Sequence, residues 1–166
     1  MKSFSIVFSI FIFSNCWSQS AKPILKKYSK EIQKIIKVEK GVFRGSDFGD
    51  TKAIIKSRET VTLQGESDST LTYTMNIDSD DSADLVYYMD TTGKAKSYAI
   101  IFILQDVNEE KSLKTDLIKF YNERFGAFEV INEEDELWTS KEGYFVEMKD
   151  TSDEAGMEIE IVYYKK

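Results

Sequence analysis

The chain of 166 residues contains no histidine, and its single cysteine is Cys16. Without histidine, neither a Ser-His-Asp nor a Cys-His catalytic arrangement can be built, and zinc sites that need histidine ligands are excluded as well. One cysteine cannot form a disulfide within the chain. We therefore expect stability to come from a packed core, and a chain of this length can bury one as a single domain.

Basic residues are also in deficit, with 22 against 29 acidic residues and a net charge of −7. Because binding to nucleic acid requires a basic surface, we exclude nucleic acid as a partner. The charge is unevenly distributed: residues 21–40 carry seven lysines against two glutamates, whereas residues 41–166 carry 14 basic and 27 acidic side chains. This pattern indicates a basic segment attached to an acidic body.

Carboxylate chemistry is the catalytic option that remains, as in a glycosidase that uses one carboxyl as acid and another as nucleophile. The 27 acidic side chains of residues 41–166 are numerous enough for pairs of carboxylates to meet by chance on a solvated surface. We therefore predict a protein that is not an enzyme and that has no catalytic residues, cofactor or metal. A carboxylate-type hydrolase is the alternative.

The N-terminus has the order of a secretory signal peptide: Lys2, then an apolar, serine-containing run over residues 4–13, then small and polar residues. The apolar run is about ten residues long, shorter than the roughly 20 that span a bilayer as a helix. We predict a signal peptide over residues 1–18, cleaved between Ser18 and Gln19 or two residues later. The protein is then exported, and is periplasmic or secreted.

Cys16 allows a second interpretation of the same segment. A bacterial lipoprotein signal ends in a cysteine that becomes the lipidated first residue, and lipidation converts a soluble protein into an anchored one. Asn15 stands directly before Cys16, where such signals carry a small residue such as glycine or alanine. Lipidation at Cys16, giving a lipoprotein associated with the membrane surface, is therefore the minor alternative.

Residues 19–40 predict a basic amphipathic helix. Pro23 suits a first helical turn, and Gly41 is a C-cap candidate. Such a helix either lies on an anionic membrane surface or packs on its own acidic domain, and we expect the packed arrangement. The apolar positions recur at helical spacing, with lysines on the other side: Ile24, Leu25, Tyr28, Ile32, Ile35 and Ile36.

The densest glycine cluster is "GVFRGSDFGDT", residues 41–51. It lacks the Gly-Lys-Ser/Thr order of a phosphate-binding Walker loop, since Gly49 is followed by Asp50, and it does not follow a predicted strand as a dinucleotide fingerprint would. We interpret it as a turn that ends the basic helix and begins the next one, with Asp50 or Thr51 as the N-cap.

The rest of the chain alternates helical and strand patterns. A helix over residues 51–59 precedes strands at 70–77, 83–90 and 94–104, and a helix over residues 109–126 precedes strands at 136–140, 144–150 and 157–166. The predicted fold class is α+β, in which an N-terminal amphipathic helix is followed by two helix-plus-three-strand units. These units, about 49–104 and 109–165, form one domain over residues 41–166, with a largely antiparallel sheet and helices on one face.

Part of this order resembles a known type of protein. "GDT" at residues 49–51, a short helix with isoleucine and lysine, a tyrosine-containing hairpin and "TGK" at residues 92–94 are similar to small envelope domains of the BamE-like and β-lactamase-inhibitor-like type. The second repeat departs from this pattern, because "NEEKS" replaces "GDT". The resemblance implies a non-catalytic exported binding module and names no partner.

The acidic stretch "DSDDSAD", residues 78–84, invites a calcium interpretation. A calcium loop that began at Asp78 would need glycine at its sixth position and glutamate at its twelfth. The residues there are Ala83 and Met89. We predict an ordinary hairpin turn.

Aromatic residues among charges in the last strands predict a binding surface, because rings supply contact area at small entropic cost. If Leu137, Val146 and Ile161 face the core, neighbouring side chains project from the opposite sheet face, beside Glu147, Lys149 and Glu160. We predict that this face binds an unidentified protein partner of the bacterial cell envelope. The predicted interaction residues are Tyr88, Trp138, Phe145 and Tyr164.

Overall fold

The computed structural model describes residues 25–37, 41–132, 135–153 and 156–166. The predicted signal peptide, its cleavage site at Ser18 and Gln19, and the alternative lipidation site Cys16 lie outside the described residues. The helices are α2 (Lys30–Ile35), α3 (Lys52–Arg58) and α4 (Val107–Phe125). The strands are β1 (Leu63–Glu66), β2 (Thr70–Asn76), β3 (Ser82–Met89), β4 (Ala95–Leu104), β5 (Glu129–Ile131), β6 (Asp135–Thr139), β7 (Phe145–Asp150) and β8 (Met157–Tyr164).

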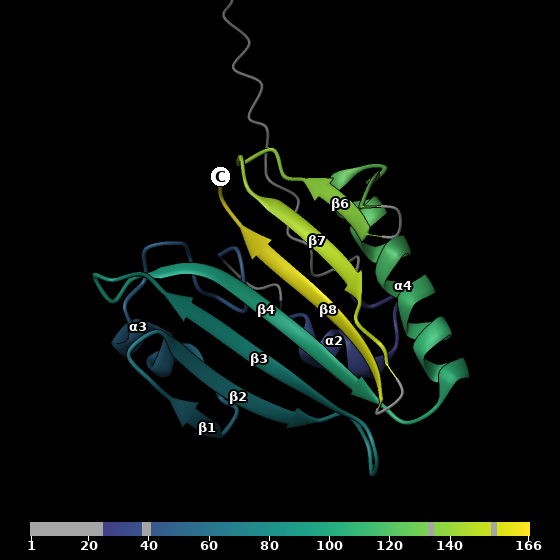
Figure 1. Ribbon diagram of the computed structural model, residues 1–166, viewed down its shortest axis with the longest axis horizontal. Helices are drawn as coiled ribbons and strands as arrows, with labels where there is room; N and C mark the ends of the chain where they lie inside the picture. Colours follow the sequence, from purple (N-terminus) through teal and green to yellow (C-terminus); the bar gives the residue numbers. More distant parts are fainter. Residues whose placement is uncertain (1–24, 38–40, 133–134, 154–155) are drawn as a thin grey trace, which may run out of the picture.

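All eight strands form one sheet in the order β1-β2-β3-β4-β8-β7-β6-β5, and every neighbouring pair is antiparallel (Figure 1). After β4 the chain passes through α4 to the far edge of the sheet at β5. It then returns strand by strand until β8 pairs with β4. The last strand therefore joins the two halves of the sheet at its centre.

The predicted antiparallel α+β character is confirmed, but the predicted arrangement of two helix-plus-three-strand units behind an N-terminal helix is wrong. The sheet contains two further strands, β1 and β5, which are four and three residues long and mostly exposed. Because short edge strands bury no apolar face, their sequences lack the alternation of apolar and polar residues by which a strand is predicted. Within the described residues, the basic segment is not one continuous helix: turn and bend residues 26–28 interrupt it, and the six-residue helix α2 ends at its C-cap Ile36.

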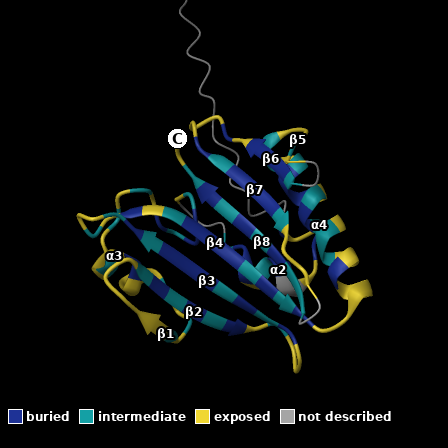
Figure 2. Ribbon diagram, viewed as in Figure 1, coloured by how far each residue is buried: buried dark blue, intermediate teal, exposed yellow. Residues whose placement is uncertain are grey.

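Strand alternation gives the sheet two different faces. Leu71, Tyr73 and Met75 of β2 are buried, whereas the threonines between them are half-buried (Figure 2). We call the buried side the covered face, because α2, α3 and α4 all pack there. Contacts that place these helices include Tyr121 of α4 with Tyr163 of β8, and Glu59 at the end of α3 with Tyr87 of β3. No helix of the described residues covers the opposite side, which we call the open face.

The glycine cluster supplies part of the core. Gly41 and Gly45 have positive φ angles of 78° and 89°, and the tight turn between them pushes the ring of Phe43 into the interior. This ring stacks on Tyr98 with 5.1 Å between centroids and meets Tyr87 and Tyr163 edge-on.

The same cluster ends at the start of α3. Thr51 is the N-cap of α3, as one of the two predicted candidates, but its side chain makes no capping hydrogen bond. The Asp50 carboxylate instead accepts hydrogen bonds from the Asp47 N–H and from Arg58. The cluster is therefore a turn that also fills the core, in addition to leading into a helix.

Candidate interaction face

The strand register brings three of the four predicted interaction residues into one row across the open face. Tyr88 of β3 lies opposite Ser97 of β4, Ser97 lies opposite Tyr164 of β8, and Tyr164 lies opposite Phe145 of β7. The rings of Phe145 and Tyr164 stack with 5.6 Å between centroids and an interplanar angle of 27°. We call Tyr88, Tyr164 and Phe145 the aromatic row. Each of its side chains is half-buried.

Trp138, the fourth predicted residue, does not lie on this face. It pairs with Val146, which pairs with Tyr163 on the covered face, and its ring is completely buried against Tyr121 at 5.1 Å between centroids. Its Nε1 donates a hydrogen bond to Oδ1 of Asn122 on α4, at 2.9 Å. The predicted alternation was one residue out of step in β6, and a slip of one residue exchanges the two faces of a strand.

A second row of the open face is mainly apolar. Because of the same register slip, Leu137 belongs to this row instead of to the core. Ala99 has no exposed surface although no described helix covers it, so the longer side chains around it close over the strand. We call this set the apolar row, and its members lie opposite one another on successive strands: Val86, Ala99, Val162, Glu147 and Leu137.

The third row carries charge. Asp84, Ile101, Glu160 and Lys149 are paired across β3, β4, β8 and β7, and we call them the charged row. Glu158 lies two residues before Glu160, on the same face of β8. The open face thus changes from aromatic to apolar to charged, in steps of two residues along each strand.

The carboxylates of this face influence one another. Burial raises the pKa of Glu160; the positive charge of Lys149 opposes that rise, and the charges of Glu147 and Glu158 add to it. Lys149 Nζ lies 3.2 Å from Oε1 of Glu147, so the one lysine of these rows is already paired with a different glutamate. The aromatic row is affected as well, because burial and the charge of Glu147 raise the pKa of Tyr164.

An acidic cluster stands apart from the open face, where the β2–β3 turn meets the start of α4. The carboxylate oxygens of Asp78, Asp81 and Glu109 lie within 4.8 Å of one another, the one such group of three among the described residues. β3 begins at Ser82, so the twelve-residue calcium loop considered from the sequence is not formed. Asp78 Oδ1 accepts hydrogen bonds from two backbone N–H groups of its own turn, and Asp81 Oδ1 accepts one from the Gln105 N–H.

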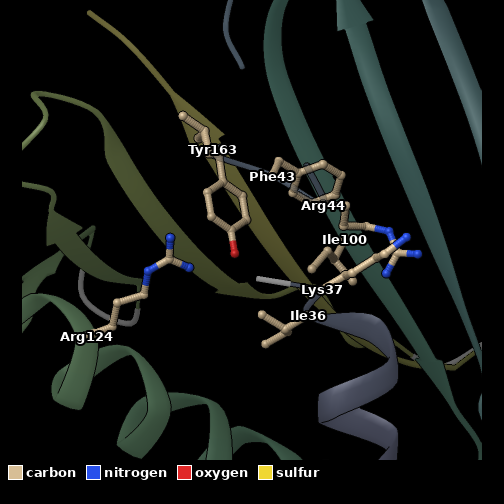
Figure 3. Close-up of a pocket in the computed structure, with 8 residues that line it drawn as sticks. Ile36, Lys37, Phe43, Arg44, Ile100, Arg124 and Tyr163 are labelled. Carbon is tan, nitrogen blue, oxygen red and sulfur yellow. The ribbon is translucent and has the colours of Figure 1, made fainter. Parts of the chain in front are cut away.

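A small pocket, with room for about one water molecule, opens on the covered face between α2, the glycine turn and α4 (Figure 3). Arg124 reaches it from α4 and the Tyr163 hydroxyl from β8, while Arg44 lies at its opposite side. Arg44 is held by Glu59 and by the carbonyl oxygens at the end of α2. No carboxylate is among the residues that line the pocket, so it offers no pair of acid and nucleophile.

Comparisons with known proteins add no assignment. No protein-family model matches the chain, and comparison with curated proteins and with solved structures found no match. Across the described residues, no helix is both long and apolar enough to cross a membrane. Among the described residues, the open face is therefore the feature that points to a function.

Proposed function

We propose that the protein is an exported, non-catalytic binding or accessory protein of the bacterial cell envelope, and that it binds a protein partner through its open face. The observation that carries this proposal is the aromatic row, because three large rings, two of them stacked, lie in one line on a sheet face that no described helix covers. Aromatic side chains with few rotatable bonds lose little entropy when they are covered, which makes them frequent anchors of protein interfaces.

The sheet is a suitable platform for such anchors. Its rows are fixed by hydrogen-bonded strands on the central part of the sheet, and the covered face beneath them is packed with buried rings. A partner would therefore meet side chains that are already held in place. Because these side chains lose less conformational entropy on binding than mobile ones, affinity is favoured. The edge strands are short, which limits pairing with other chains along the edges.

Affinity capture from native envelope extracts tests the proposal. The variant Tyr88→Ser/Phe145→Ser/Tyr164→Ser should retain less than about a tenth of the partner that the unchanged protein retains, since loss of interface anchors costs more than 1 kcal/mol each. Val130→Ser is the matched control, because Val130 is the most exposed large apolar residue described, at 63%, and lies outside the three rows. Full retention of the partner by the triple variant would remove the open face from the function.

Export rests on the N-terminal pattern and has its own test. Intact mass of the protein recovered from its native host should correspond to a chain that begins at Gln19 or two residues later. A mass that includes Cys16 with attached acyl chains would assign the protein to the lipoproteins instead. An uncleaved chain in the cytosol would overturn export altogether.

A further inference from the structure

We infer that the partner presents a cationic amphipathic segment to the open face: its apolar side chains pack on the half-buried aromatic row and along the edge of the apolar row, and its lysine or arginine side chains meet the glutamates beside them. This inference rests on the proposed function, in which the open face binds a protein. It adds the chemistry of the partner, which that proposal leaves open.

The balance of charge on the face carries the first step. The rows contain the carboxylates of Asp84, Glu147 and Glu160, and Glu158 lies beside them on β8. Against these four stand the ammonium groups of Lys149 within the rows and of Lys166 at the Phe145 end. Lys149 lies directly opposite Glu160 but forms its ion pair with Glu147. The face therefore has an excess of negative charge next to apolar side chains.

Glu160 is a carboxylate of this face that a partner's cation can pair with. Its carboxylate accepts no hydrogen bond and forms no ion pair within the described part of the chain, and it is half-buried between Ile101 and Lys149. Lys149, opposite Glu160, compensates this charge only in part, because Lys149 is ion-paired with Glu147 and the charges of Glu147 and Glu158 act against Glu160. A cation brought by a partner supplies that compensation at Glu160 and Glu158 together.

The excess of negative charge disfavours other occupants of the face. A second copy of the chain would place its own excess of carboxylates against the carboxylates of this face. Like charges brought together at an interface cost roughly several kcal/mol. An anionic lipid surface is repelled for the same reason. A basic protein segment is attracted, and complementary charge also accelerates its encounter with the face.

Geometry sets the shape of the segment. Neighbouring rows are two residues apart along a strand, which is roughly 7 Å, so the aromatic and charged rows are separated by roughly 13 Å. An α-helix about 10 Å across can cover the aromatic and apolar rows while its lysines reach the glutamates. The aromatic row already accepts a cation at one end, because Lys166 Nζ lies 4.7 Å from the centroid of the Phe145 ring.

Two synthetic helical peptides test the inference. One consists of leucine and lysine, the other has glutamate at every lysine position, and each is titrated into the purified, processed protein. The lysine peptide should bind and the glutamate peptide should not. Glu158→Gln/Glu160→Gln should weaken binding of the lysine peptide about tenfold and reduce its salt dependence, since two exposed ion pairs contribute up to about 1 kcal/mol each. Asp68→Asn/Asp80→Asn, which neutralises two exposed turn residues away from the face, is the matched control and should bind like the unchanged protein.

The outcomes separate this inference from the proposed function. If the aromatic triple variant loses the native partner while Glu158→Gln/Glu160→Gln keeps it with unchanged salt dependence, the face binds protein but the cationic chemistry is wrong. If the lysine peptide fails to bind, or if the glutamate peptide or anionic phosphatidylglycerol vesicles bind equally well, the inference is likewise wrong. If the partner is retained by the aromatic variant as well, the proposed function fails first. Far-ultraviolet circular dichroism confirms that each variant is folded.

Discussion

The guanidinium of Arg44 and the carboxylate of Glu59 form an ion pair inside the protein, with Arg44 Nε 2.5 Å from Glu59 Oε1 and both side chains at most 2% exposed. Arg44 Nη2 donates to Glu59 Oε2 at 3.1 Å, and the Tyr87 hydroxyl donates to Glu59 Oε1 at 2.7 Å. Arg44 Nη1 donates to the Lys34 carbonyl oxygen at 3.1 Å. One buried network thus connects the glycine turn, α2, the end of α3 and strand β3.

Replacing Arg44 by methionine should destabilise the protein by about 3–5 kcal/mol, because Glu59 would remain as a buried charge without its partner. Urea unfolding of the variant and the unchanged protein measures this loss. Arg58→Met is the matched control, because it removes an ion pair between Arg58 and Asp50 at the surface. The Arg58 side chain is 41% exposed, so its loss should cost at most about 1 kcal/mol. Equal losses in the two variants would contradict a structural role for the buried pair.

The same pair makes stability depend on pH. Burial alone would raise the pKa of Glu59, but the hydrogen bonds and charge of Arg44 and the hydrogen bond of Tyr87 outweigh it and hold the pKa below its ordinary value of 4.5. A lowered pKa means that the carboxylate contributes stability above pH 4.5, which is lost as the pH falls through the pKa of the folded state. Unfolding free energies from about pH 3 to 7 should therefore fall less steeply at the acid end for Glu59→Gln than for the unchanged protein. Parallel curves would show that Glu59 is not the titrating group.

Gly41 should tolerate alanine much less well than Gly49. Both have positive φ angles, 78° and 91°, but a Cβ at Gly41 would lie 2.7 Å from the Ser46 carbonyl oxygen, whereas a Cβ at Gly49 would meet nothing within 4 Å. Both alanine variants therefore carry the strain of a left-handed backbone, and only Gly41→Ala adds a clash with backbone. We expect Gly41→Ala to lower the thermal midpoint by several degrees more, since about 1 kcal/mol shifts it by roughly 2–4 °C in a domain of this size. Similar midpoints would mean that the turn relaxes freely around the new methyl group.

The sequence predicted the elements with strong periodicity and missed those without it. The alternation of β2 and β8 and the helical spacing of α4 were readable because one side of each element is buried. In β6 the residues Glu136, Leu137 and Trp138 are all buried, so the strand has no alternation to give its register. Register there is set by pairing with β7, which is a contact between strands and not a property of β6 alone.

The candidate site was predictable in its residue types but not in its assembly. Phe145 and Tyr164 stood beside charged residues in the sequence, and their placement followed from the patterns of β7 and β8. Tyr88 joins them only because β4 pairs with β8, which brings the two halves of the chain together. Pairings between distant strands leave no local pattern, so a row across them appears only in the folded structure.

Trp138→Phe should separate stability from binding. The substitution removes the Nε1–H group that donates to Asn122 Oδ1. Because Asn122 is half-buried, the loss of this hydrogen bond should cost about 1 kcal/mol. Partner binding should be unchanged because Trp138 lies on the covered face. Phe145→Ser should show the opposite pattern in the same two measurements, urea unfolding and retention of the partner. Loss of partner binding by a folded Trp138→Phe protein would place Trp138 in the interface after all.

The hydroxyls of Tyr121 and Tyr163 provide a last test, of how α4 is held on the sheet. They lie 2.6 Å apart and are buried, and burial raises the pKa of Tyr163 to about 12, so both are neutral at ordinary pH. Tyr121→Phe and Tyr163→Phe should each cost about 1–2 kcal/mol, because each leaves a buried hydroxyl without its partner.

The double variant should cost little more than either single one, since it removes both hydroxyls and leaves neither unpaired. Urea unfolding of the four proteins gives the coupling free energy directly. Additive losses would mean that each hydroxyl bonds independently to another group. Tyr121 and Tyr163 would then link α4 to the sheet through contact of their rings and not through a shared hydrogen bond.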